Sequence, residues 1–232
     1  MITIAHIHTP FPEKFGIPRQ SGLAAAATGM IVMEPEFRNP DAFRGIEEFS
    51  HLWLLWEFSE AKQESFHATV APPRLGGKER RGVFATRSPF RPNSIGLSCV
   101  KLEEFRVDER LGPVLDVSGM DLLDGTPIYD IKPYLPYTDA HPEAIGGFAD
   151  AHAGDQLHVE FPEELMKELP GELREAAIDV LAQDPRAAYN KKPDYVYGMA
   201  FDAYDIRFVV QEDCLIVQEV RPRKKGDFDK VK

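Results

Sequence analysis

The sequence is poor in cysteine and has no long apolar run. Cys99 and Cys214 are the only cysteines among 232 residues, so we expect neither a disulfide framework nor a cysteine-based zinc site. No stretch of about 18 apolar residues is present, which argues against a transmembrane helix. The first residues, MITIAHIHTPFPEKF, lack the basic start and the apolar stretch of a secretory signal. We therefore expect a cytoplasmic protein.

Common motifs of nucleotide and hydrolase chemistry are also missing. No G-x-G-x-x-G follows a predicted strand and there is no phosphate-binding P-loop, so a dinucleotide-binding fold is not supported. No G-x-S-x-G nucleophile motif occurs. His6 and His8 alternate on a predicted strand without a third ligand nearby in the sequence, and His51 opens an apolar run, where a structural role is the better expectation. We expect no metal site.

Acidic side chains outnumber basic ones, but not evenly along the chain. The net charge is −11, which argues against nonspecific adhesion to nucleic acid. Residues 1–101, however, carry 12 basic and 10 acidic side chains. If the protein binds a polyanion, the first half should hold it, and selectively.

The most basic segment is 72–97, PPRLGGKERRGVFATRSPFRPNSIGL. Its glycines and prolines favour an irregular, held loop over a long helix. Phe84 and Phe90 lie among its cations, and arginine can pair at two points with a carboxylate or a phosphate. A basic run is more often a solvated face, but the interleaved aromatic rings favour a pocket wall. The basic residues are Arg74, Lys78, Arg80, Arg81, Arg87 and Arg91, against the single acid Glu79.

Short apolar or alternating segments separated by glycine and proline predict a mostly β protein. The first half gives strands at 2–8, 28–33, 50–58, 66–71, 82–86, 95–106, 113–120 and 127–132, with Asp124-Gly125 as a hairpin turn before the last. This pattern indicates an antiparallel barrel or sandwich. After a loop-like exit at 133–154, helices at 163–169 and 172–182 and strands at 195–201, 205–211 and 215–221 predict a small α+β unit.

One carboxylate stands out in the predicted strand after the Asp124-Gly125 turn. Asp130 lies between Tyr129 and Ile131, and a carboxylate among apolar neighbours needs a partner. A structural ion pair with an arginine and a functional role are both open on this pattern.

Four longer strings resemble the TrmO family of tRNA methyltransferases, also called TsaA-like. They are GIPRQSGL, FRGIEEFSHLWLLWEF, APPRLGGKERRGVFATRSPFRPNSIGLS and DLLDGTPIYDIKPYLPY, and LAQDPRAAY (181–189) resembles the signature of the family's second domain. The resemblance implies a compact antiparallel β-barrel N-terminal domain, assigned to residues 1–140, followed by a small α+β C-terminal domain at 155–232. It implies S-adenosylmethionine as cofactor, a homodimer with the cofactor near the subunit interface, and methylation of N6 of N6-threonylcarbamoyladenosine at position 37 of tRNA.

The resemblance also assigns candidate site residues by position. Asp130 is the candidate base, with a route through water as the alternative. Expected cofactor contacts are Gln20, Ser21, Gly22, Leu23, Ser59, Glu60, Arg87, Leu97, Ile128, Tyr129, Asp130 and Ile131. Expected tRNA contacts are Arg19, Arg74, Lys78, Arg80, Arg81, Arg91, Arg186 and Tyr189, of which the last two either help read the anticodon loop or brace the second domain.

A noncatalytic reading competes with this assignment. The acidic second half leaves room for a barrel that senses S-adenosylmethionine and regulates a partner. Salt dependence separates the two readings, because an RNA complex weakens steeply as salt rises and a small-molecule sensor hardly responds.

Overall fold

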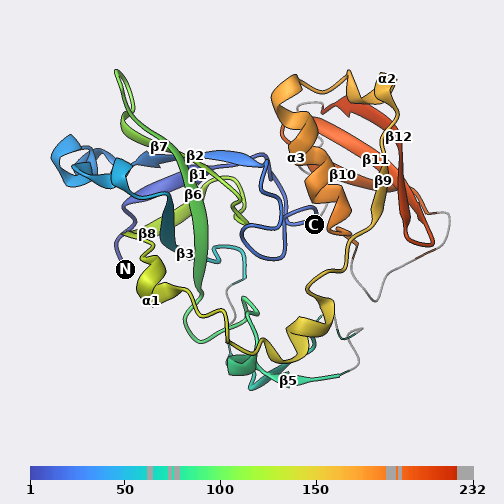
Figure 1. Cartoon of the computed structure of the whole chain (residues 1–232), viewed down its shortest axis with the longest axis horizontal. Helices are drawn as coiled ribbons and strands as arrows, with labels where there is room; N and C mark the ends of the chain where they lie inside the picture. Colours follow the sequence, from blue (N-terminus) through green and yellow to red (C-terminus); the bar gives the residue numbers. More distant parts are fainter. Residues whose placement is uncertain (62–64, 73–74, 76–78, 187–191, 193–194, 224–232) are drawn as a thin grey trace.

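The first half of the chain forms a closed β-barrel (Figure 1). The computed structural model describes residues 1–61, 65–72, 75, 79–186, 192 and 195–223. The barrel strands are β1 (Ala5–His8), β2 (Thr28–Met33), β3 (His51–Glu57), β6 (Ile95–Asp108), β7 (Gly112–Ser118) and β8 (Thr126–Pro133). They pair antiparallel in the order β1-β2-β7-β6-β3-β8, and β8 closes the barrel by pairing with both β1 and β3. The predicted mostly β architecture is confirmed.

Every second side chain of the barrel strand β3 points into the barrel and helps to fill its core. In β3 the side chains of Leu52, Leu54 and Trp56 are buried, and the residues between them are partly exposed. Such a period of two puts every second side chain on one face of a strand. Trp56 lies opposite Gly96 of β6, so the large indole occupies the space that the missing side chain leaves.

The Asp124-Gly125 turn does not make the predicted hairpin. Gly125 has a φ of +75°, which suits a tight turn, but β8 pairs with β1 and β3 rather than with β7. Both edges of β7 are already paired, with β2 and with β6. The prediction was wrong because a turn signal determines the local bend of the chain but not which strands the next strand pairs with.

The strand predicted at 82–86 is also largely wrong. Only β5 (Arg81–Gly82) is extended there, and it pairs with β4 (Thr69–Val70). The chain then turns into the short 3₁₀ helix η5 (Val83–Ala85). The Thr86 hydroxyl donates to the Val83 carbonyl at 2.9 Å and the Thr86 N–H at 3.2 Å, and these two bonds hold the turn.

Short elements connect the barrel to the rest of the chain. Between β2 and β3 run three 3₁₀ helices, η1 (Pro35–Phe37), η2 (Pro40–Phe43) and η3 (Ile46–Glu48). After β8 come α1 (Pro136–Asp139) and η6 (Gly147–His152), which lies near β5 at the bottom of Figure 1. Among the described residues, no helix is long and apolar enough to cross a membrane.

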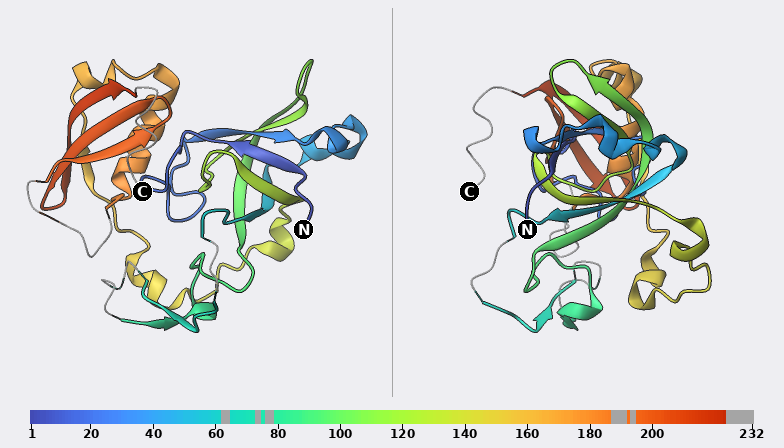
Figure 2. Two further views of the ribbon diagram at one scale, coloured as in Figure 1. Left: turned by 180° about the vertical axis from the view of Figure 1, so that it is seen from behind. Right: turned by 90° about the vertical axis from the view of Figure 1, so that its left-hand side faces the viewer.

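The last part of the chain forms a separate sheet with helices packed on it (Figure 2). The strands are β9 (His158–Glu160), β10 (Tyr197–Phe201), β11 (Tyr204–Gln211) and β12 (Cys214–Pro222), in the order β10-β11-β12-β9. The helices are α2 (Glu163–Met166) and α3 (Gly171–Ala182), and α3 buries Ala176, Ala177, Val180 and Leu181. Sequence analysis missed β9, a three-residue strand that pairs parallel with β12.

The barrel and the second sheet share one hydrophobic core. Phe11, which follows β1, packs against Phe201 of β10 with ring centroids 6.1 Å apart. The Asp202 N–H donates to the Pro10 carbonyl at 2.7 Å. A Cβ added at Gly16 would lie 2.7 Å from the Met199 side chain, so β10 presses directly on the loop after β1. That loop leads into the cavity described next.

Candidate active site

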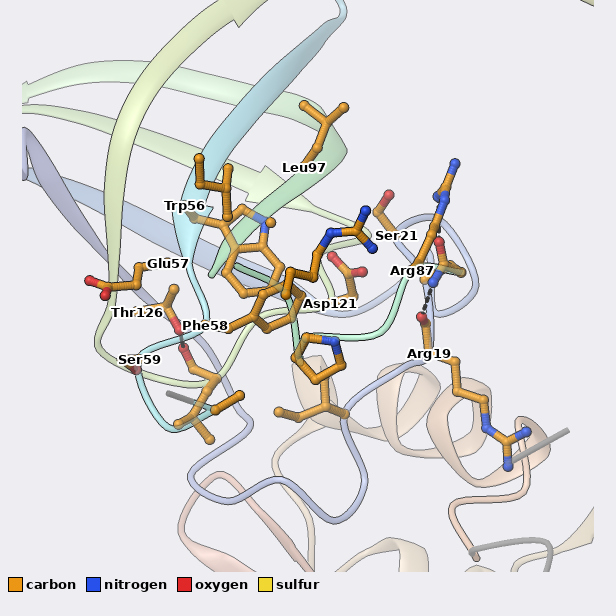
Figure 3. A pocket seen from close by; sticks show the side chains of 18 of the residues that line it. Arg19, Ser21, Trp56, Glu57, Phe58, Ser59, Arg87, Leu97, Asp121 and Thr126 are labelled. Atoms are coloured by element: carbon orange, nitrogen blue, oxygen red, sulfur yellow. Dashed lines mark hydrogen bonds between the residues drawn. The ribbon is translucent and has the colours of Figure 1, made fainter. Parts of the chain in front are cut away.

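A cavity of about 650 Å³ opens where β3 ends and β6 and β8 begin. Its walls come from the loop at 17–21, the end of β3 with the residues after it, the segment 86–91 and the start of β6 (Figure 3). This volume lies within the range of pockets that enclose small organic ligands and cofactors.

Aromatic and aliphatic side chains form one wall of the cavity. The Trp56 indole is 5% exposed and meets the Phe58 ring edge-on, with centroids 4.2 Å apart. The Trp56 Nε1–H donates to the Ser98 hydroxyl at 2.9 Å. Phe90 and Leu97 also line the cavity and are 42% and 57% exposed. A flat ring ligand such as a nucleobase can lie against such a wall.

A guanidinium lies on the opposite side. Arg87 is exposed, and it donates to the side-chain oxygen of Gln20, whose own amide donates to the Arg19 carbonyl (Figure 3). The Cys99 N–H donates to the Ser21 hydroxyl at 3.2 Å, which ties the same loop to β6. The loop at 17–21 therefore holds the Arg87 side chain in place through Gln20.

The loop continues into a turn that needs glycine. Gly22 has a φ of +82°, a conformation that other residues seldom adopt. Its N–H donates to the carbonyl of Gly119 at 2.7 Å. Gly22 and Leu23 themselves do not line the cavity, so their role here is to shape the loop that does.

Asp121 is a carboxylate of the cavity whose pKa is shifted. It accepts a hydrogen bond from Ser98, which in turn accepts from Trp56. Burial raises the pKa of the Asp121 carboxyl, and the Ser98 bond and the positive charge of Arg87 oppose this only in part. A carboxylate with a raised pKa beside a cavity is typical of groups that exchange protons during a reaction.

Two glutamates contribute further negative charge. Glu57 accepts a hydrogen bond from the Tyr129 hydroxyl, and burial together with this bond raises the pKa of Tyr129 to about 12. Glu60 lies 3.3 Å from the Lys14 ammonium. The cavity thus combines an apolar wall, the guanidiniums of Arg19, Arg87 and Arg91 and several carboxylates, a set that suits a zwitterionic ligand with an additional positive charge.

The structure brings together half of the predicted cofactor contacts. Those that line the cavity are Gln20, Ser21, Ser59, Glu60, Arg87 and Leu97. The β8 group, Ile128, Tyr129, Asp130 and Ile131, does not. Ile128 is fully buried in the barrel core, and Tyr129 donates a hydrogen bond to Glu57, which lines the cavity.

Asp130, the predicted base, lies elsewhere on the barrel. Its carboxylate pairs with the Lys132 ammonium at 2.8 Å. With Ile131 it lines a second, smaller hollow of about 330 Å³, whose other walls include Met33 and Phe43. Within one chain, Asp130 therefore does not face the main cavity, and its ion-pair partner is a lysine rather than the expected arginine.

The predicted tRNA contacts are spread over three places. Arg19 and Arg91 line the cavity. Arg80 donates to the Thr69 hydroxyl and carbonyl, and Arg81 pairs with Glu79 at 2.6 Å. Arg74, Lys78 and Tyr189 lie outside the described residues.

Arg186 is buried rather than presented to a ligand. Its side chain is 6% exposed and makes a two-point pair with Asp184, at 2.7 and 3.0 Å. Its guanidinium also lies 5.9 Å from the centre of the Tyr197 ring. This arrangement fits the bracing role. The backbone carbonyls of Asp184 and Arg186 both accept from the Arg19 guanidinium at 3.2 Å, which links the second sheet to the cavity loop.

Sequence analysis missed three important residues of the site. Trp53 and Trp56 lie in the strand predicted at 50–58 and were not assigned to the site, yet both line the cavity, and Trp53 donates to Asp139 at 2.9 Å. Asp121 was not singled out at all. A signal was present, because a carboxylate between the apolar residues Met120 and Leu122, both fully buried, must either find partners or serve a function.

Comparisons with known proteins agree with this architecture. Residues 6–140 match the model of the tRNA-methyltransferase O N-terminal domain, and residues 154–223 match that of the TrmO C-terminal domain. The chain is 40% identical over 228 residues to the Escherichia coli (strain K12) protein named tRNA (adenine(37)-N6)-methyltransferase, covering 95% of this chain and 97% of that one. It is 43% identical over 213 residues to a Pseudomonas aeruginosa protein named putative S-adenosylmethionine-dependent methyltransferase RcsF, covering 88% and 90%.

A solved structure gives the same result. The crystal structure of TrmO from Pseudomonas aeruginosa superposes with a TM-score of 0.75 at 38% identity, covering 94% of this chain and 97% of that one. Both domain models, in the order expected for the family, span the barrel and the second sheet. The chain therefore belongs to the tRNA-methyltransferase O family.

Proposed function

We propose that this protein is an S-adenosylmethionine-dependent methyltransferase that methylates N6 of N6-threonylcarbamoyladenosine at position 37 of tRNA. The observation that carries the proposal is the cavity itself, which sets a nucleobase-sized apolar wall and a guanidinium around a carboxylate, Asp121. Relatives of the protein are named tRNA (adenine(37)-N6)-methyltransferase, and this name supplies the position in the tRNA and the atom that is methylated.

The residues of the cavity fit the cofactor. Arg87 pairs with its carboxylate, since a guanidinium offers a two-point match. Trp56, Phe58 and Leu97 hold its adenine ring. When bound, S-adenosylmethionine supplies a methyl group on a positively charged sulfur. The carboxylates of Asp121 and Glu57 favour that positive charge at this place.

Asp121 is the proposed proton acceptor. Bound S-adenosylmethionine would supply the methyl group, and the N6 nitrogen that receives it would have to give up its proton to a group of the protein. Asp121 lines the cavity, and burial raises its pKa toward the range in which a carboxylate accepts a proton more readily. The hydrogen bond from Ser98 keeps the carboxylate oriented. We therefore transfer to Asp121 the role that the sequence suggested for Asp130.

A homodimer accounts for the β8 residues. The family resemblance implies a cofactor near the subunit interface, and Ile128, Tyr129, Asp130 and Ile131 do not line the cavity of their own chain. We propose that exposed groups of this strand, Asp130 among them, reach the cavity of a second copy. Mixing an Arg87→Ala chain with an Asp130→Ala chain tests this: activity regained in the mixture supports sharing between subunits, and no recovery contradicts it.

The substrate RNA lies along the basic segment beside the cavity. Arg19 and Arg91 line the cavity, and Arg80 and Arg81, directly before and at the start of β5, add further positive charge. Position 37 adjoins the anticodon, so the target base is in a loop and needs little unstacking. Binding by phosphate contacts predicts a steep loss of affinity with rising salt.

A methyl-transfer assay tests the function. Purified protein and labelled S-adenosylmethionine are mixed with tRNA that carries or lacks the threonylcarbamoyl group, and nucleosides are identified by mass spectrometry. Methyl on the modified tRNA alone supports the proposal. Cofactor binding without transfer to either RNA contradicts it and favours the sensor. Asp121→Asn should lower the transfer rate by about 10²- to 10⁴-fold, a much larger factor than the rise in the Kd for cofactor, because Glu57 still supplies a negative charge in the cavity.

A further inference from the structure

Two phenylalanine rings lie exposed and stacked beside the cavity. Phe66 is 57% exposed and Phe84 is 72% exposed. Their ring centroids are 6.2 Å apart, with 24° between the ring planes. Rings of this size are usually buried to a large extent, so an exposed stacked pair indicates a surface that contacts something. We call Phe66, Phe84 and Arg91 the aromatic platform.

Arg91 joins the aromatic platform to the cavity. Its guanidinium lies 5.8 Å from the centre of the Phe84 ring, and the same residue lines the cavity. It donates to the carbonyls of Val83 at 3.2 Å and Thr86 at 2.8 Å. Val83 is 1% exposed and anchors this turn in the protein. The platform is thus held in a fixed place at the edge of the proposed methyl-transfer site.

The surroundings of the aromatic platform are basic. Arg80, directly before β5, is held against Thr69 of β4 by two hydrogen bonds, at 2.8 and 2.7 Å. Arg81 is the first residue of β5, and its guanidinium lies 5.8 Å from the Phe148 ring centre. This concentration of cations occurs in a chain of net charge −11. Exposed rings among guanidiniums are the features that bind unpaired nucleotides, by stacking on the bases and by attraction to the phosphates.

We infer that the aromatic platform binds an unpaired nucleobase of the substrate RNA adjacent to the methylated adenosine. The base stacks on Phe84, Phe66 supports that ring from its other side, and Arg91 faces the neighbouring phosphate. The site fixes the RNA so that the next nucleotide enters the cavity. This inference rests on the proposed function and adds to it a second base-binding position outside the cavity.

Three substitutions at Phe84 test the inference. Phe84→Ala removes the ring, Phe84→Leu keeps apolar bulk without a flat face, and Phe84→Tyr keeps the ring. Val107→Ala, at a residue 57% exposed on the far end of β6, is the control. The readouts are the KM for modified tRNA, the Kd for S-adenosylmethionine and the sedimentation coefficient of each protein.

Alanine and leucine should raise the KM for tRNA by about 5- to 150-fold, the loss expected for one base stacked on an aromatic ring. The Kd for the cofactor should not change. Tyrosine and the control should behave as the unaltered protein. Equal effects of alanine and tyrosine, or no effect of alanine, would overturn the inference, and so would a dissociated oligomer, which would make the rings a subunit contact.

A double-mutant cycle identifies the stacked base directly. Anticodon stem-loops lacking the base on one or the other side of position 37 are bound to the unaltered protein and to Phe84→Ala. One of the two abasic RNAs should bind the unaltered protein more weakly than the intact RNA does. Phe84→Ala should bind that abasic RNA and the intact RNA with the same affinity. Additive losses with both RNAs refute the stacking contact. Because binding is measured separately from transfer, a protein that binds RNA through Phe84 but does not methylate it would reject only the proposed function, and a protein that does not bind RNA rejects both.

Discussion

Replacing Gly96 by alanine tests how closely the wall of the cavity is packed. A Cβ at this position would lie 2.2, 2.4 and 2.5 Å from three ring carbons of Trp56, where ordinary contacts are 3.4–4 Å. The indole must therefore move by roughly 1 Å or more to relieve the overlap. Trp56 is 5% exposed and packed inside the barrel, so it has little room to move.

The cost has two parts. Adding a methyl group to a filled core costs about 1–3 kcal/mol. The displaced indole also loses its 2.9 Å hydrogen bond to Ser98, worth about 1 kcal/mol. We expect Gly96→Ala to lower the free energy of unfolding by about 2–4 kcal/mol, a large share of the total stability of a typical domain. Because Trp56 is a cavity wall, we also expect the Kd for S-adenosylmethionine to rise on the order of tenfold.

Urea unfolding followed by tryptophan fluorescence measures the first effect, and calorimetric titration measures the second. Gly171→Ala is the matched control, because a Cβ at Gly171, at the start of α3, meets nothing within 4 Å. Alanine there should leave stability unchanged or raise it slightly. If Gly96→Ala unfolds within about 0.5 kcal/mol of the unaltered protein, the close packing of glycine against indole is wrong, and with it this account of the cavity wall.

Three other predictions concern titration and burial. The pKa of Asp121 is raised above 3.8, so the stabilisation from its protonated form is complete below pH 3.8 and is lost as the pH rises through the folded-state pKa. Over that rise in pH, the free energy of unfolding of Asp121→Asn should increase relative to that of the unaltered protein. A difference between the two proteins that does not change with pH would contradict the raised pKa. Arg186→Met should cost about 3 kcal/mol by removing the guanidinium that pairs with the largely buried Asp184 carboxylate, whereas Arg207→Met, at a side chain 39% exposed, should cost less than about 1 kcal/mol; equal urea midpoints would refute this. Burial raises the pKa of both Cys99 and Cys214, so both should react slowly with iodoacetamide at pH 8. Bound cofactor should slow Cys99 further, since only Cys99 of the two lines the cavity, and equal protection in peptide mass spectra would argue against the site.

Much of the barrel could be predicted because its strands alternate cleanly. The prediction of a strand at 28–33 coincides with β2, and the apolar run at 50–58 contains β3. Strand pairing could not be predicted, because it depends on contacts between segments distant in the sequence. The Asp124-Gly125 turn illustrates this limit: its bend is local, but the partners of β8 are residues 5–7 and 52–56.

The candidate site was predictable where cations and turn residues mark it. Arg87 and Arg91 were found in this way, whereas Gln20 was assigned only through the family resemblance; all three line the cavity. Trp56 was not assigned to the site because a period of two does not tell which buried side chain lies at the end of a barrel, next to an opening. Asp121 was missed because its distinguishing property, burial beside Ser98, exists only once β6 and the residues after β7 are brought together.

The contact between Phe11 and Phe201 has a consequence for how the protein tolerates change. Two family models divide the chain between residues 140 and 154, yet the apolar groups on either side of that division cover one another. A chain shortened at that point would expose Phe11 and leave the loop at 17–21 without Met199 behind it and without the Asp184 and Arg186 carbonyls for Arg19. We therefore expect the two domains to unfold together. A substitution that destabilises β10 should also weaken the binding of the cofactor.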